Sequence, residues 1–145
     1  MRVLAIDPGS KWIGIAVSDP TGTIARPLAI LKHLSQDKDV HSIIELAKKN
    51  EASKIIIGHS LDDEGLPNSQ SQSAERLAKT IRSKTNIPVE FWDETGSTKV
   101  VQKAWIQMGV PRRKRRSRQD DLAATYILQS YLDAHSDESS NNTVF

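Results

Sequence analysis

Cysteine is absent from this chain of 145 residues, and aromatic residues make up only 5% of it. Without cysteine there can be no disulfide, no thiolate metal site and no cysteine nucleophile, so any metal must be held by oxygen or imidazole ligands. The sequence also contains no glycine-rich nucleotide loop. Carboxylates are therefore the natural candidates for the chemistry.

Long hydrophobic runs are also missing, since no apolar stretch approaches the ~18 residues that a membrane-spanning helix needs. Met1 leads directly into an apolar, strand-like segment at Val3 rather than into a signal peptide. We expect a cytoplasmic protein that does not contact membranes. The low content of glycine and proline, 7 and 6 residues, indicates one globular domain over residues 1–134, followed by a disordered polar tail at 135–145.

The formal net charge of +2 hides an asymmetry, because six of the 20 basic residues lie between Arg112 and Arg118. These six residues are Arg112, Arg113, Lys114, Arg115, Arg116 and Arg118. No aromatic residue interrupts the run, so we expect it to bind backbone phosphates without reading sequence. The charge distribution favours nucleic acid as a partner.

Hydrophobic periodicity predicts the secondary structure. Strands are expected at 3–6, 12–18, 23–31, 55–58 and 89–92. Helices are expected at 37–50, around 74–81, around 100–108 and over 119–134, with a polar, turn-rich segment at 60–72. Three consecutive strands followed by alternating helices and strands predict an α/β fold with a mixed five-stranded sheet and helices on both faces.

Acidic residues stand at the ends of three of these elements: Asp7, the pair Asp93-Glu94 and the pair Asp120-Asp121. Singly, each has a structural interpretation, such as a turn at Asp7 or a helix N-cap at Asp120. Together, three carboxylates at element ends favour a site for Mg²⁺ or Mn²⁺, with two ions ~4 Å apart that stabilise a phosphodiester displacement. Helical spacing separates the last pair, because Asp120 is in line with the apolar stripe of the final helix and Asp121 lies at its edge.

Four stretches together resemble the YqgF family, whose members are described as Holliday-junction resolvases or pre-16S rRNA nucleases. The first two are Asp7-Pro8-Gly9-Ser10-Lys11 with Ile13-Gly14-Ile15-Ala16-Val17-Ser18, and Ile57-Gly58-His59-Ser60-Leu61 through Gly65. The other two are Asp93-Glu94 with Ser97-Thr98, and Asp120 through Ala123-Ala124 to Ile127-Leu128-Gln129-Ser130-Tyr131-Leu132. The stretches agree in order and spacing and cover the chain except its tail.

The resemblance implies a ribonuclease H-like fold and a nuclease with catalytic metal ligands Asp7, Glu94 and Asp120. The residues alone do not separate Asp93 from Glu94. The implied reaction is hydrolysis of structured nucleic acid, either at the 5′ end of precursor 16S rRNA in ribosome biogenesis or at a Holliday junction in DNA. Thr95-Gly96 stand where the family commonly has Arg-Leu, Trp12 where Arg is frequent and Ser60 where Pro is usual.

A lysine, a histidine and the tryptophans are further candidates for contact with nucleic acid or for proton transfer. Lys11 is a candidate for phosphate binding beside Asp7, with a solvated turn lysine as the equal alternative, and His59 is a weak candidate for proton transfer. The three tryptophans, Trp12, Trp92 and Trp105, are expected to pack in the core or on a sheet face rather than to stack on bases.

Two other classes of protein stay open as alternatives. One is a non-catalytic nucleic-acid-binding module or ribosome-assembly factor whose acidic residues have lost their metals. The other is an actin-like ATPase or sugar kinase, which also begins with a phosphate-binding Asp-x-Gly turn but needs two such domains around its nucleotide. The sequence does not decide between RNA and DNA, or between a monomer and a homodimer.

Overall fold

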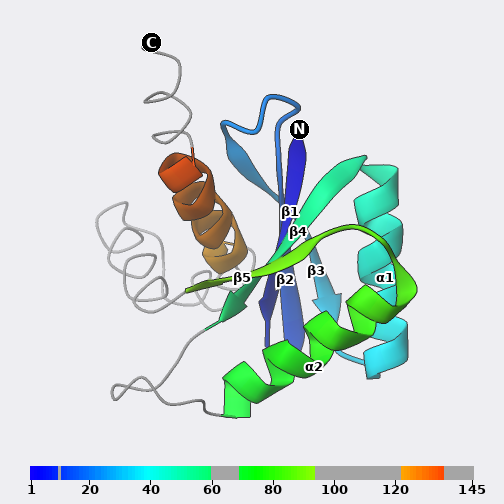
Figure 1. Ribbon diagram of the computed structural model, residues 1–145. Helices are drawn as coiled ribbons and strands as arrows, with labels where there is room; N and C mark the ends of the chain where they lie inside the picture. Colours follow the sequence, from blue (N-terminus) through cyan, green and yellow to red (C-terminus); the bar gives the residue numbers. More distant parts are fainter. Residues whose placement is uncertain (10, 60–68, 94–121, 136–145) are drawn as a thin grey trace.

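The computed structural model describes residues 1–9, 11–59, 69–93 and 122–135, which form one five-stranded sheet covered by helices (Figure 1). In chain order the elements are β1 (Arg2–Pro8), β2 (Trp12–Ser18), β3 (Ala25–Lys32), α1 (Gln36–Lys49), β4 (Ala52–His59), α2 (Ser69–Lys84) and β5 (Val89–Asp93). A further helix spans residues 122–135 and is called the 122–135 helix below. No helix in the described ranges is both long and apolar enough to cross a membrane.

The sheet has the strand order β3-β2-β1-β4-β5. The first three strands of the chain pair antiparallel, and β4 and β5 extend the sheet in parallel with β1. This arrangement confirms the predicted mixed sheet. Several strand ends differ from the prediction by one to three residues, and the start of α2 was wrong: α2 begins at Ser69, inside the segment expected to be a polar loop. Its first turn contains only Ser and Gln, so apolar periodicity does not reveal the helix before Ala74.

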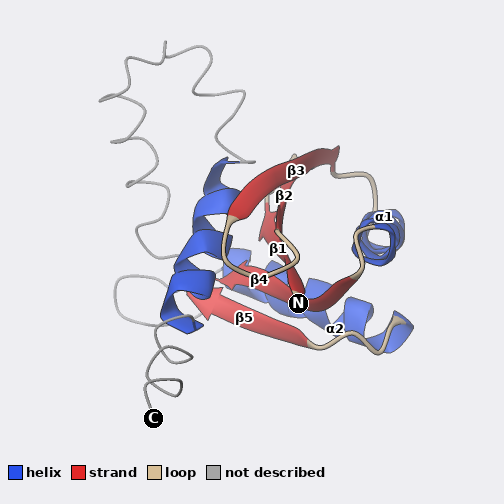
Figure 2. Cartoon of the chain, turned by 90° about the horizontal axis from the view of Figure 1, so that it is seen from above, coloured by secondary structure: helices blue, strands red, loops and turns tan. Residues whose placement is uncertain are grey.

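Alternation along β1 divides its side chains between the two faces of the sheet. Leu4 and Ile6 join the core under α1 and α2, whereas Val3 and Ala5 join the core under the 122–135 helix. Seen from above, the 122–135 helix lies on the opposite side of the sheet from α1 (Figure 2). Both faces of β1 are therefore buried, as its continuous apolar run predicts for a central strand.

A tight turn joins β2 to β3. The amide N–H of Gly22 donates to the carbonyl of Asp19 over 3.0 Å, and Gly22 has a φ of 72°, which favours glycine. The Asp19 carboxylate accepts from the backbone N–H groups of Ile24 and Thr23 over 2.9 and 2.8 Å, and from the Thr21 hydroxyl. These donors, the Ile24 amide foremost, hold the pKa of Asp19 well below its usual range.

Polar contacts tie the 122–135 helix to the sheet. The Lys54 ammonium on β4 donates to the Tyr131 hydroxyl over 2.7 Å and pairs with Glu90 on β5 at 2.9 Å. Burial by itself lowers the pKa of Lys54, but the hydrogen bonds with Tyr131 and Glu90 outweigh it and leave the pKa raised. The Trp92 indole N–H donates to the Ser130 hydroxyl over 3.2 Å, and its ring meets the Tyr131 ring edge-on at 5.3 Å.

Candidate active site

Asp7 is the last residue but one of β1, and its side chain is half-buried. It pairs with Gly14 of β2, and its place in the alternation puts it on the same face as Val3 and Ala5, the face covered by the 122–135 helix. The parallel strands β1, β4 and β5 all end at this edge of the sheet. Ligand sites in sheets of this kind lie beyond the carboxyl ends of the parallel strands, which is where Asp7 is placed.

Glycine is required directly after this strand. A Cβ built on Gly9 would lie 2.3 Å from the carbonyl oxygen of Trp12, a distance that no real side chain tolerates. Because that oxygen belongs to the backbone of β2, the clash could be relieved only by moving the strand. Gly9 thus lets the turn after Asp7 pass close to the start of β2.

Two of the three predicted ligands, Glu94 and Asp120, lie outside the described residues, as do all six residues of the basic run. Within the described ranges, no group of three or more His, Asp or Glu residues is placed to hold a metal. The elements next to Glu94 and Asp120 in the sequence are described. β5 ends at Asp93, directly before Glu94, and the 122–135 helix begins two residues after Asp120.

Lys11 and His59, the two further candidates for the site, lie at different places relative to Asp7. Lys11 is exposed in the turn between β1 and β2, next to the end of the strand that carries Asp7. His59 ends β4, two residues after Ile57, and its ring lies 5.1 Å from that of Phe91. Ile57 and Phe91 belong to the core under α1 and α2, so the sheet separates His59 from the face of Asp7. This arrangement does not favour proton transfer by His59 at Asp7.

The tryptophans divide into two kinds. Trp92 packs against the core under the 122–135 helix, as expected. Trp12 is not a core residue, because 46% of its surface is exposed, so of the two expected placements only packing on the sheet face stays open. Trp12 is the first residue of β2, and apolar patterning assigns it to the strand without showing how much of its side chain is covered. Trp105 lies outside the described residues.

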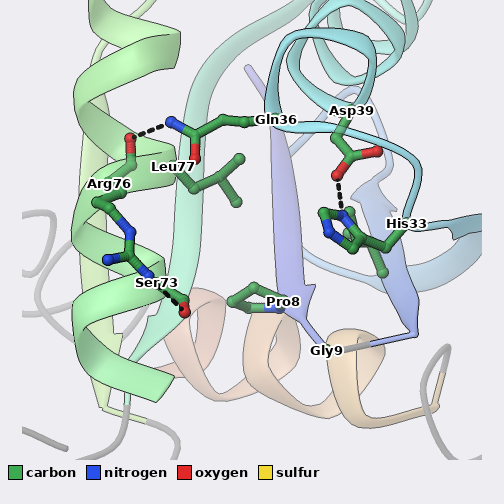
Figure 3. A pocket seen from close by; sticks show the side chains of 9 residues that line it. Pro8, Gly9, His33, Gln36, Asp39, Ser73, Arg76 and Leu77 are labelled. Atoms are coloured by element: carbon green, nitrogen blue, oxygen red, sulfur yellow. Dashed lines mark hydrogen bonds and ion pairs between the residues drawn. The ribbon is translucent and has the colours of Figure 1, made fainter. Parts of the chain in front are cut away.

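A pocket with a volume of about 220 Å³ opens on the other side of the turn after Asp7 (Figure 3). Its lining includes Pro8 and Gly9 from the turn and His33, Asp39, Ser73 and Arg76 from elements around it. The buried Asp39 carboxylate is hydrogen-bonded to the His33 ring and accepts from the Leu34 amide over 3.1 Å, and Arg76 donates to Ser73 over 3.3 Å. This pocket was not predicted from the sequence. The available signal was Asp39 itself, which precedes Ile43 by four residues and so lies on the apolar stripe of α1.

Solved structures share this architecture. The chain superposes on the RuvC protein of T. thermophilus in complex with a Holliday junction substrate with a TM-score of 0.61 at 16% identity, over 94% of this chain and 96% of that one. The fowlpox virus Holliday junction resolvase gives a TM-score of 0.57 at 17% identity, over 92% and 99% of the two chains. At this identity the likeness establishes the fold, which is ribonuclease H-like.

Sequence comparison goes further than the fold. The family model described as "RuvX: Holliday junction resolvase" matches residues 1–134, so the chain belongs to the RuvX family. A relative from Syntrophus aciditrophicus is 41% identical over 95% of this chain and 92% of its own length. Another from Clostridium acetobutylicum is 34% identical over 92% of this chain and 99% of its own. Both relatives are named "Putative pre-16S rRNA nuclease". These matches confirm the resemblance found in the motifs, and the chain is a nuclease.

Proposed function

We propose that this nuclease hydrolyses phosphodiester bonds with divalent metal ions held by Asp7, Glu94 and Asp120. The observation that carries the proposal is the position of Asp7, half-buried at the carboxyl end of β1 on the face covered by the 122–135 helix. A carboxylate there reaches the edge where three parallel strands end. Gly9 after it has no room for a side chain, so the chain leaving β1 passes close to the backbone of Trp12.

Periodicity in the described elements supports the other two ligands. In β5, Trp92 packs on the face of the 122–135 helix and Phe91 on the face of α1 and α2. Continued alternation predicts Glu94, rather than Asp93, on the face of Asp7. In the 122–135 helix, Ala123, Ala124 and Ile127 follow Asp120 by three, four and seven residues, and all three are buried. Asp121 is followed after three and seven residues by Ala124 and Leu128, which are also buried. The residue four positions on, Thr125, is only half-buried, so Asp121 lies at the edge of the stripe.

The proposed donor set fits a hard divalent cation, because carboxylate oxygens are the ligands that Mg²⁺ and Mn²⁺ prefer. Such ions, when bound, activate a water and stabilise the entering and leaving oxygens of the phosphate. The contribution of the chain is to fix the carboxylates on strand and helix ends. Asp7 in particular is held by a strand that is paired on both sides.

We assign precursor 16S rRNA as the substrate, with processing at its 5′ end as the reaction, because this is the RNA in the names of the full-length relatives. Branched DNA is the second candidate, favoured by the description of the family model. The basic run from Arg112 to Arg118 suits either substrate, since phosphate contacts carry no sequence information.

The first test is cleavage of labelled precursor rRNA, single-stranded RNA and a four-way DNA junction, with Mg²⁺ or Mn²⁺, by the wild type and by Asp7→Asn. We expect Asp7→Asn to abolish cleavage, because it removes one of the charges that hold the metal. Asp37→Asn is the matched control, since Asp37 is 84% exposed on α1, and should cleave normally. Binding of nucleic acid without cleavage by the wild type would favour the non-catalytic module instead.

The second test separates Asp120 from its neighbour. Asp120→Asn should abolish cleavage while leaving the metal-free fold equally or more stable, because it relieves repulsion among the carboxylates. Asp121→Asn should retain most of the activity. Cleavage rates and melting temperatures of both variants, with and without Mn²⁺, give the answer. If Asp121→Asn is the inactive variant, the phase of the helix is wrong by one residue, and if both variants cleave, the metal site is wrong.

A further inference from the structure

We propose that Trp12 stacks against an unpaired base of the nucleic acid and so holds the strand beside Asp7. The inference rests on the proposed function, because it assigns a role in gripping the substrate of the same site. Trp12 is the first residue of β2, and its side chain is 46% exposed. Among the described residues, no aromatic ring packs on Trp12, whereas Trp92 packs on both Tyr131 and His135.

The register of the sheet places Trp12 and Asp7 on the same face. Asp7 pairs directly with Gly14, and directly paired residues of antiparallel strands project to the same side. Trp12 precedes Gly14 by two residues, so it shares that side as well. Diagonal neighbours of this kind lie about 7–8 Å apart, within reach of an aromatic side chain. Gly14 between them contributes no side chain to separate the two.

Exposed cations flank this indole. Lys11 precedes it in the turn, and Lys32 pairs with it across β2 and β3; both lysines are exposed. Next along β3, Ile30 pairs with Gly14 and is 37% exposed, which extends the apolar surface on the same face. An aromatic platform beside basic side chains is the combination that grips single-stranded nucleic acid, through base stacking and phosphate attraction.

An unpaired base is the occupant that these features favour. Stacking needs the face of a base, which a continuous duplex keeps covered by the neighbouring base pairs. An RNA end offers such bases directly, and at the branch point of a junction the continuous stacking of the arms is interrupted, so a base face becomes accessible when the terminal pair opens. Trp12 thus selects for unpaired nucleotides at the cleavage position, in a way that does not depend on base identity.

The experiment measures binding of fluorescent single-stranded RNA and of a fully paired duplex of equal length, in an Asp7→Asn background that does not cleave. Trp12→Ala should weaken binding of the single strand by ~5- to 150-fold, the range found for loss of one base–aromatic stack. Trp12→Phe, which keeps an aromatic ring, should stay within a few-fold of the parent. Duplex binding should change little in either variant.

Two comparisons show whether stacking is the cause. The salt dependence of binding should be the same in Trp12→Ala and the parent, because no phosphate contact is lost, whereas Lys11→Ala should make it shallower. Ile24→Ala is the matched control for loss of an exposed apolar side chain, since Ile24 is 63% exposed near the turn at the opposite end of β2. It should bind like the parent. Melting temperatures confirm that every variant is folded.

The stacking proposal is overturned if Trp12→Ala binds the single strand as tightly as the parent, if duplex binding falls equally, or if the parent binds no single strand. The proposed function fails on a different observation, the absence of metal-dependent cleavage by the wild type. Because binding is measured in a variant that cannot cleave, the two failures are distinguishable.

Discussion

The two faces of the sheet are closed in different ways. On one face, two helices cover an apolar cluster drawn from all five strands and both helices, with Ile6, Ile57 and Ile81 among its fully buried members. On the other face, the 122–135 helix covers a smaller cluster. That helix is also tied down by polar contacts, such as those of Lys54 with Tyr131 and of Trp92 with Ser130.

This difference separates the larger apolar core from the proposed metal site. The two-helix face carries more apolar burial and therefore more of the hydrophobic stabilisation. The face on which the described part of the chain places the 122–135 helix carries Asp7 and Trp12, at a strand end where Asp7 is half-buried and Trp12 is exposed. In the proposed function, the substrate binds on this face, on the other side of the sheet from the larger core. We therefore expect substitutions on the two faces to have different consequences.

The largest effect should come from adjacent isoleucines on β4. Ile57 belongs to the cluster under α1 and α2 and Ile56 to the cluster under the 122–135 helix, and both are fully buried. Either change to Ala should lower the free energy of unfolding by about 2–5 kcal/mol. Ile57→Ala should cost more, because two helices held against each other adjust less to a cavity than one helix does. Denaturant unfolding of both variants measures the difference.

Amide hydrogen exchange in the Ile57→Ala and Ile56→Ala variants tests whether the two clusters are independent. Ile57→Ala should lower amide protection in α1 and α2, and Ile56→Ala should lower it mainly in the 122–135 helix. Equal costs with the same loss of protection in all three helices would show that the two clusters act as one core.

A smaller effect is expected at Asp39, the buried carboxylate on the side of α1 and α2. Asp39→Asn should lower the free energy of unfolding by about 1–3 kcal/mol, because it weakens the bonds with His33 and with the Leu34 amide. The exposed neighbour variant Asp37→Asn, compared by the same denaturant titration, should be nearly neutral. If the two variants unfold alike, this face depends on apolar packing alone.

The smallest effect should be at Lys54. Lys54→Met keeps the aliphatic stem but removes the hydrogen bonds to Tyr131 and Glu90, at a cost of about 1 kcal/mol at neutral pH. The pKa of Lys54 is raised in the folded state, so its contribution is complete below the unfolded pKa and is lost as pH rises through the folded pKa. The gap between wild type and variant should therefore close in alkaline solution. Lys84→Met, which removes the exposed ion pair with Asp37, should change the free energy of unfolding by less. If Lys54→Met differs from the wild type by the same free energy at all pH values, the hydrogen bonds of Lys54 with Tyr131 and Glu90 do not stabilise the fold.

Much of the fold could be predicted because its strands are regular. The range 12–18 was predicted and is that of β2, and the continuous burial of β1 from Val3 to Ile6 follows directly from its apolar run. The polar first turn of α2 gave no apolar signal, so its start was missed. The exposure of Trp12 was also missed, since apolar patterning does not show how much of a side chain is covered. The pocket beside Asp39 joins residues that are far apart in the chain and can be found only after folding.

The alternation of β1 also limits how this chain can change in length. Ile6 and Asp7 are neighbours, yet one faces the core of α1 and α2 while the other lies on the face of the 122–135 helix. Removing or adding one residue in this strand would exchange the two sets of side chains. Asp7 would then be placed among the apolar side chains under α1 and α2, and the proposed metal site would lose this carboxylate. Natural variation in length should therefore be confined to the connections, such as the turn from Asp19 to Gly22, while β1 varies only by replacement of one residue with another.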